Sequence, residues 1–153
     1  MFWRQQQPQQ TSLLQKHVET VEQILYSINI NPQQAQMPTE NGYGWSFQQG
    51  SALIEIYLAE QEGREYLQVL APLFHLPQQS VLPLYRRLLE LNLSLTNASL
   101  GVYLDVVYVF NERPLTGLGI EEANFIIKQI AQYADDLDDE LVQRFGGRLY
   151  SQA

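Results

Sequence analysis

The stretch "SALIEIYLAEQEGREYLQVLAPLF", residues 51–74, decides the fold class. Its first part alternates three aliphatic residues with Glu55 and Tyr57, the two-residue period of a strand with one buried face. The segment "EGR" then turns the chain into a second strand-like run, residues 65–74. So short a turn joins antiparallel neighbours, because parallel strands need a long crossover. The stretch therefore predicts the centre of an antiparallel meander.

Further strands and helices surround this meander. Residues 43–49 form an aromatic-rich strand, and residues 98–112 are predicted to form two strands that break near Leu104-Asp105. Helical periodicity is present in three segments: residues 12–29 with Ser12 as N-cap, residues 79–95 with Ser80 as N-cap, and residues 120–145, stopped by Gly146-Gly147. The order α-β-β-β-α-β-β-α groups the strands instead of alternating them with helices. It predicts an α+β fold with a five-stranded antiparallel sheet and three helices.

The length of 153 residues suits a single domain, which we expect over residues 12–147. Residues 1–11, rich in Gln, are predicted to be a flexible tail, and residues 148–153 a short C-terminal tail. Residues 31–41 contain two prolines and are predicted to be a connecting loop.

Composition and charge narrow the function classes. The net charge of −8 argues against nucleic acid and against anionic membranes, because phosphate groups attract basic surfaces. Without cysteine the chain forms no disulfide, thiolate zinc site or cysteine nucleophile. The first ten residues lack the apolar region of a secretory signal, and no apolar run is long enough to span a bilayer. We therefore expect a soluble, cytoplasmic protein without a cofactor.

The acidic run 135–140 raises the question of a metal site. Asp135, Asp136 and Asp139 match the pattern D-D-x-x-D, which resembles the magnesium-diphosphate motif of isoprenoid synthases. On the predicted helix, however, they lie roughly 180–280° from Ile126, on the side away from the apolar stripe, with no second set of ligands evident. We favour a solvated helix face and keep a metal-dependent enzyme using Asp135 to Glu140 as the alternative.

The predicted helix 79–95 has more apolar surface than one sheet can cover. Its apolar arc spans about 200°, whereas a stripe of about 100° seats a helix on a core. Leu82, Leu89 and Leu93 extend this arc beside Arg86. Another helix of the chain, a second subunit or a client must cover the surplus. We favour an intermolecular surface formed by these four residues, with a homodimer as the expected assembly.

Four aromatic residues on the predicted meander suggest a second possible binding face. Trp45, Phe47, Tyr57 and Tyr66 could bind a ligand together, although cross-strand packing explains them equally well.

The order of elements resembles the type III secretion chaperone-like fold, which includes the bacterial YbjN-like proteins. The resemblance spans residues 12–145 and rests on "LLELNLSLTNASLGVYLD" and "VYVFNERPLTGLGIEEANFIIKQIAQYADDLDDEL". The shared features are a Leu-rich helix ending at Asn92, a hairpin, the Pro114-Leu115 loop, and a final helix carrying Ala134-Asp135. Secretion-type members are small acidic homodimers that bind extended effector segments and have no catalytic residues. YbjN-like members are proposed regulators.

These observations favour a non-enzymatic protein-interaction module that binds a partner segment as a chaperone or regulator. Apolar helix and sheet surfaces, together with any unpaired strand edge, would accept that segment. The rival interpretation is a small-ligand sensor or a metal-dependent enzyme. A deep pocket with convergent polar groups would favour the rival, and a flat apolar face would favour the module.

Overall fold

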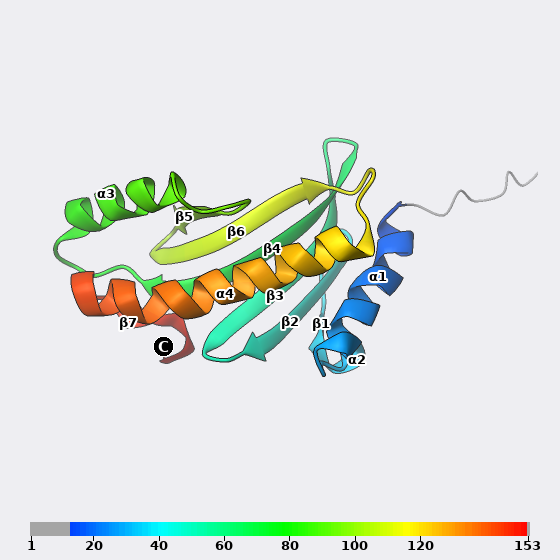
Figure 1. Cartoon of the computed structure of the whole chain (residues 1–153), viewed down its shortest axis with the longest axis horizontal. Coiled ribbons are helices and arrows are strands. Elements are labelled where there is room, and N and C mark those ends of the chain that lie inside the picture. The colour runs from blue at the N-terminus through cyan, green and yellow to red at the C-terminus, as the bar shows by residue number, and fades with distance from the viewer. Residues whose placement is uncertain (1–12, 153) are drawn as a thin grey trace, which may run out of the picture.

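The computed structural model of the chain describes residues 13–152, so the Gln-rich tail and Ser12 lie outside the described residues. One antiparallel sheet forms the centre (Figure 1). Its seven strands are β1 (Gln36–Met37), β2 (Tyr43–Gln49), β3 (Ala52–Gln61), β4 (Arg64–His75), β5 (Ser99–Tyr103), β6 (Val106–Pro114) and β7 (Arg148–Leu149). The helices are α1 (Leu13–Ser27), α2 (Pro32–Ala35), α3 (Val81–Asn92), α4 (Ile120–Phe145) and the 3-10 turn η1 (Tyr150–Gln152).

The predicted meander lies at the centre of the sheet. The strand order is β1-β2-β3-β4-β6-β5, and β7 pairs with the end of β4. The β3–β4 turn consists of Glu62 and Gly63, with φ of 52° and 76°, which is the geometry of a tight two-residue hairpin turn. Burial alternates along β3, with every second residue buried from Ala52 to Leu58. The α+β class and the antiparallel sheet are confirmed.

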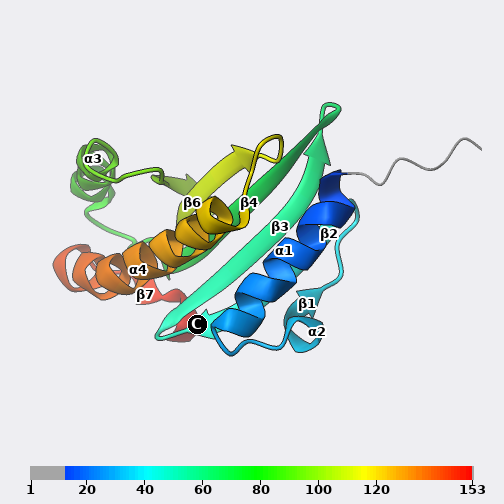
Figure 2. The same ribbon diagram turned by 45° about the vertical axis from the view of Figure 1, so that its right-hand side comes forward.

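The core lies between one face of the sheet and two helices. Figures 1 and 2 show α1 and α4 over the same sheet face, with α3 at the end where β5 lies. The predicted apolar stripe of α4 consists of Ile126, Ile130, Tyr133, Leu137 and Leu141, and all are buried except Tyr133, which is half-buried. Burying each such side chain stabilises the fold by roughly 1.5–3 kcal/mol. The opposite face of the sheet has no α-helix over it in the described part of the chain.

The segment predicted as a loop, residues 31–41, contains the short helix α2 and strand β1. Asn31 caps α2, because its side chain accepts hydrogen bonds from the N–H groups of Gln33 and Gln34. Pro32 occupies the first turn, where its missing N–H costs nothing. Asn31 followed by Pro32 is typical of a helix start, but the segment around this pair is polar and was therefore predicted to be a loop.

Helix α3 is shorter than the predicted 79–95. Ser80 precedes it as expected, but its φ is 63° and its side chain makes no cap hydrogen bond. At the other end, the Asn92 side chain pairs with Leu100 of β5, accepting from its N–H at 2.7 Å and donating to its carbonyl at 3.2 Å. This pairing fixes the end of α3 against the edge of the sheet.

The predicted break near Leu104-Asp105 is present, although it lacks Gly or Asn. Leu104 takes a φ of 54°, a conformation that leucine rarely adopts. Beyond α4, the segment predicted as a tail contributes β7, which pairs Leu149 with Phe74 and Arg148 with His75. Gly146 and Gly147 supply the positive φ values that turn the chain back onto β4.

Candidate protein-interaction surface

Helix α3 buries one face and leaves another bare. Its buried residues are Leu84 and Leu88. Leu82, Leu89 and Leu93 are exposed by 80%, 68% and 91%. Steps of seven and four residues place these three leucines in one row along the helix, here called the α3 row. No other described element covers the α3 row.

Arg86, the fourth predicted contact residue, lies beside the α3 row and is paired within the helix. Its Nε donates to Glu90 Oε1 at 2.9 Å, one turn further along, and both side chains are largely exposed. An exposed pair of this kind contributes little to stability. It does keep a polar border next to the leucines.

A second apolar area lies near α3, on strand β5, the β5–β6 turn and the neighbouring strand β6. Tyr103 and Leu104 are exposed by 70% and 81%, and Val102 and Phe110 by about two fifths. We call these four residues the β5 patch. Strand β5 pairs with β6 alone among the described strands, so its other edge offers unpaired backbone groups.

Hydrogen bonds hold the connection between α3 and β5 in place. The Asn111 amide donates to the Asn97 backbone carbonyl at 2.7 Å and to its side-chain oxygen at 3.0 Å. The N–H of Thr96 donates to the Tyr133 hydroxyl of α4 at 2.9 Å. The α3 row and the β5 patch are therefore parts of one fixed framework.

The acidic run of α4 is exposed except at one residue. Asp135, Asp136 and Asp139 are exposed as predicted, but Asp138 is only 5% exposed, so the prediction of a wholly solvated run is wrong there. Asp138 Oδ2 accepts from the Ser51 hydroxyl at 3.2 Å, and its Oδ1 accepts from the Asp139 N–H at 2.6 Å. Position 138 borders the core stripe and faces the β2–β3 turn, which excludes water.

Burial raises the pKa of the Asp138 carboxyl, an effect that its hydrogen bonds to Asp139 and Ser51 partly oppose. Asp135 Oδ1 also accepts from the Ser51 hydroxyl, at 3.1 Å. The run therefore fastens a turn at this point. Across residues 13–152, no three His, Asp or Glu side chains come together in an arrangement that could hold a metal ion.

The four aromatic residues predicted to share one face are divided between two. Trp45 and Phe47 are buried beneath the helices, whereas Tyr57 and Tyr66 are half-buried on the open face. The register explains the division, because Trp45 pairs with Ile56 and Tyr57 pairs with Gly44. Successive residues of a strand point to opposite faces.

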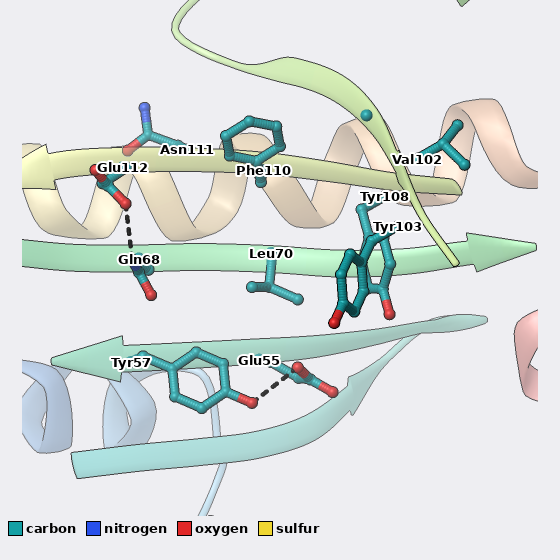
Figure 3. Close-up of a pocket in the computed structure, with 11 residues that line it drawn as sticks. Glu55, Tyr57, Gln68, Leu70, Val102, Tyr103, Tyr108, Phe110, Asn111 and Glu112 are labelled. Atoms are coloured by element: carbon teal, nitrogen blue, oxygen red, sulfur yellow. Dashed lines mark hydrogen bonds between the residues drawn. The ribbon is translucent and has the colours of Figure 1, made fainter. Parts of the chain in front are cut away.

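The open face contains a cavity of about 420 Å³ that the sequence did not reveal. Figure 3 shows its lining side chains, which come from β3, β4, β5 and β6. They include Glu55, Tyr57, Gln68, Leu70, Tyr108 and Phe110. The alternation along β3 indicated that Glu55 and Tyr57 share a face. Gln68 and Leu70 lie on the adjacent strand of the predicted meander, whereas Tyr108 and Phe110 come from β6, whose pairing with β4 only the fold determines.

Comparison with solved structures places this fold. A chain of the ExsC–ExsE complex matches with a TM-score of 0.66 at 15% identity, covering 86% of this chain and 97% of that one. A chain of the heterodimeric ExoU–SpcU complex from the type III secretion system of Pseudomonas aeruginosa matches with a TM-score of 0.55 at 15% identity, covering 78% and 95%. YbjN from E. coli matches with a TM-score of 0.56 at 15% identity, covering 88% and 93%.

No protein-family model matches the sequence, and no curated protein matches it. At these identities the structural likeness establishes the fold. The chain has the type III secretion chaperone-like fold that it shares with YbjN, as the sequence resemblance predicted. No helix in the described part of the chain is long and apolar enough to cross a membrane.

Proposed function

We propose that this chain is a non-enzymatic protein-interaction module, a chaperone-like or regulatory binder of a partner protein segment. One observation carries the proposal. Seven of the ten most exposed large apolar side chains among the described residues lie on α3 and its C-cap residue Leu93, β5, the β5–β6 turn and β6. Such clustering of apolar surface marks an interaction site, whereas scattered exposed residues need no explanation.

The shared fold supports a protein as the partner. Two of the solved structures with this fold are complexes of two different proteins. In the present chain, the unpaired edge of β5 offers backbone hydrogen bonds to an extended segment, and the β5 patch offers apolar contacts beside it. Together these are the requirements for binding by strand addition.

The α3 row has a different occupant in this proposal, a second copy of the chain. A helix row of Leu82, Leu89 and Leu93 is self-complementary when two helices pack about a twofold axis. The partner segment then binds at β5 and the neighbouring sheet face, and the dimer leaves that surface free.

The test is affinity capture from the native cell, with variants that change the β5 patch but not the core. Tyr103→Lys with Leu104→Asn removes two exposed apolar groups, and Asn tolerates the positive φ at position 104 better than Leu does. Phe125→Lys on α4, where Phe125 is 52% exposed, is the matched control.

We expect a defined protein that co-purifies with the wild type and with Phe125→Lys and is lost from the double variant. The proposal fails if the double variant retains the same protein. A small molecule in place of a protein, detected by native mass spectrometry of the purified chain, would instead support the sensor alternative, for which the open-face cavity provides space.

A further inference from the structure

The open-face cavity carries two negative charges that no cation balances. Glu55 and Glu112 line it, and no Lys, Arg or His does. The hydrogen-bond partner of each carboxylate is neutral (Figure 3). The Tyr57 hydroxyl donates to Glu55 Oε2 at 3.0 Å, and the Gln68 amide donates to Glu112 Oε2 at 2.7 Å. Within residues 13–152, neither glutamate forms a salt bridge.

Aromatic rings line the same cavity. Tyr57, Tyr103, Tyr108 and Phe110 contribute them, and Tyr103 and Tyr108 lie together at one end in Figure 3. The face of an aromatic ring attracts a cation, so rings and carboxylates together favour a positively charged group. Leu70 adds an apolar floor between the two glutamates, against which an aliphatic stem can pack.

The acid–base properties of the cavity agree with this chemistry. Burial, followed by the nearby Glu55, raises the pKa of Tyr57 to about 12. Burial chiefly raises the pKa of Tyr108 as well, with a contribution from Glu55. Burial opposes a charge of either sign on both rings, whereas the Glu55 contribution reflects a negative potential that a cationic group would neutralise.

We propose that this cavity receives an arginine or lysine side chain of the partner segment. This inference rests on the proposed function and specifies the chemistry of the segment. Continuity with the β5 patch favours a protein source over a free cation, because Val102, Tyr103 and Phe110 belong to both surfaces. A segment that crosses β5 brings its side chains over the cavity, where the basic head meets the glutamates and the stem lies on Leu70.

The experiment is peptide selection against the immobilised full chain, with random seven-residue peptides displayed on phage. We expect the selected peptides to share one Arg or Lys flanked by apolar residues. A synthetic copy of the best peptide should bind about tenfold more weakly when citrulline replaces that arginine, or norleucine that lysine. The Glu55→Gln with Glu112→Gln variant should lose a similar amount of affinity for the unmodified peptide. The variant should bind the citrulline or norleucine peptide only slightly more weakly than it binds the unmodified one, because the same interaction is already lost.

Glu60→Gln with Glu62→Gln is the matched control, because it removes the same charge from exposed positions outside the cavity. The inference is overturned if selected peptides lack a basic residue, or if both double variants weaken binding equally. In either case peptides still bind, so the proposed function survives. Failure to select any peptide overturns both proposals. If arginine amide binds as tightly as the peptide, the inference that a partner protein supplies the basic group is overturned, and the cavity is a site for a free organic cation.

Discussion

Asp138 fastens the β2–β3 turn to α4 while its charge is held away from water. It accepts hydrogen bonds from Ser51 and from the Asp139 N–H, yet burial remains the largest influence on its pKa and raises it. The unfolded chain therefore loses this proton at a lower pH than the folded chain. Between the two pKa values the folded state binds more protons, so the free energy of unfolding falls as pH rises through that window.

Replacing Asp138 with Asn should remove this pH dependence. The amide keeps one acceptor oxygen for the Asp139 N–H and can donate to the Ser51 hydroxyl. We expect Asp138→Asn to raise the melting temperature at pH 7 and to leave it nearly unchanged near pH 3, where the carboxyl is protonated in both states. Differential scanning calorimetry across this range is the measurement.

Asp136→Asn, at an exposed position of the same run, is the control and should change little at either pH. A lower melting temperature of Asp138→Asn at pH 7 would show that the ionised carboxylate is needed by the turn.

At the scale of elements, α3 combines a firm attachment with a bare apolar row. Leu84 and Leu88 seat it on the core, and Asn92 ties its end to β5. The α3 row takes no part in either attachment. A change there should therefore affect assembly and leave folding intact.

Leu89→Glu should convert the proposed homodimer into a folded monomer. It places a charge in the seam twice, once from each subunit, where each buried leucine would contribute roughly 1.5–3 kcal/mol. Light scattering should show a halved mass, with a circular dichroism spectrum close to that of the wild type. Phe125→Glu, which adds the same charge at an exposed position of α4, should remain dimeric.

A wild type that is already monomeric at high micromolar concentration would contradict the dimer. Unfolding of Leu89→Glu would show that this leucine supports the core, despite its 68% exposure.

The acidic run of α4 should show only weak association with divalent cations. Asp135 and Asp136 are hydrogen-bonded to Ser51 and Gln132, and no facing ligands accompany them in the described part of the chain. Calorimetric titration with magnesium, manganese and calcium should reveal no micromolar site. Asp135→Asn with Asp139→Asn should change the free energy of unfolding by no more than about 0.5 kcal/mol, since lost repulsion offsets a lost hydrogen bond. A micromolar site abolished by these substitutions would reject the interpretation.

At the scale of the whole molecule, the C-terminal segment joins parts of the sheet that are distant in sequence. Strand β7 pairs with the end of β4, and the Tyr150 ring stacks on His75 with centroids 5.6 Å apart. His75 Nδ1 in turn lies 3.1 Å from Asp105 Oδ2 in the β5–β6 turn. One end of the sheet is therefore held by β4, β6 and the C-terminal segment together.

Truncation after Gly147 should destabilise the fold by about 1–3 kcal/mol, through lost strand pairing and lost apolar burial. The midpoint of urea unfolding measures this loss. Removal of only residues 152–153 serves as the control, because it keeps β7 and Tyr150. Equal midpoints for the two truncations would show that β7 adds nothing to stability.

The sequence by itself determined those elements whose repeat of apolar residues and whose ends are both marked by residues close in the chain. Strand β2 has the predicted bounds. Helix α4 spans the predicted 120–145, because its helical repeat of apolar residues is followed by two glycines that accept positive φ. The Leu-rich arc of α3 likewise revealed more apolar surface than a core needs, since side-chain direction in a helix follows from spacing alone.

Only the tertiary structure decided what distant segments do to one another. The buried carboxyl of Asp138 depends on a turn 87 residues earlier. The cavity depends on β6 pairing between β4 and β5, and the role of residues 148–149 depends on the end of β4 being free to accept a strand. Local periodicity determines which side chains share a face of their own helix or strand. Which element faces it, and whether water is excluded there, follows from long-range packing.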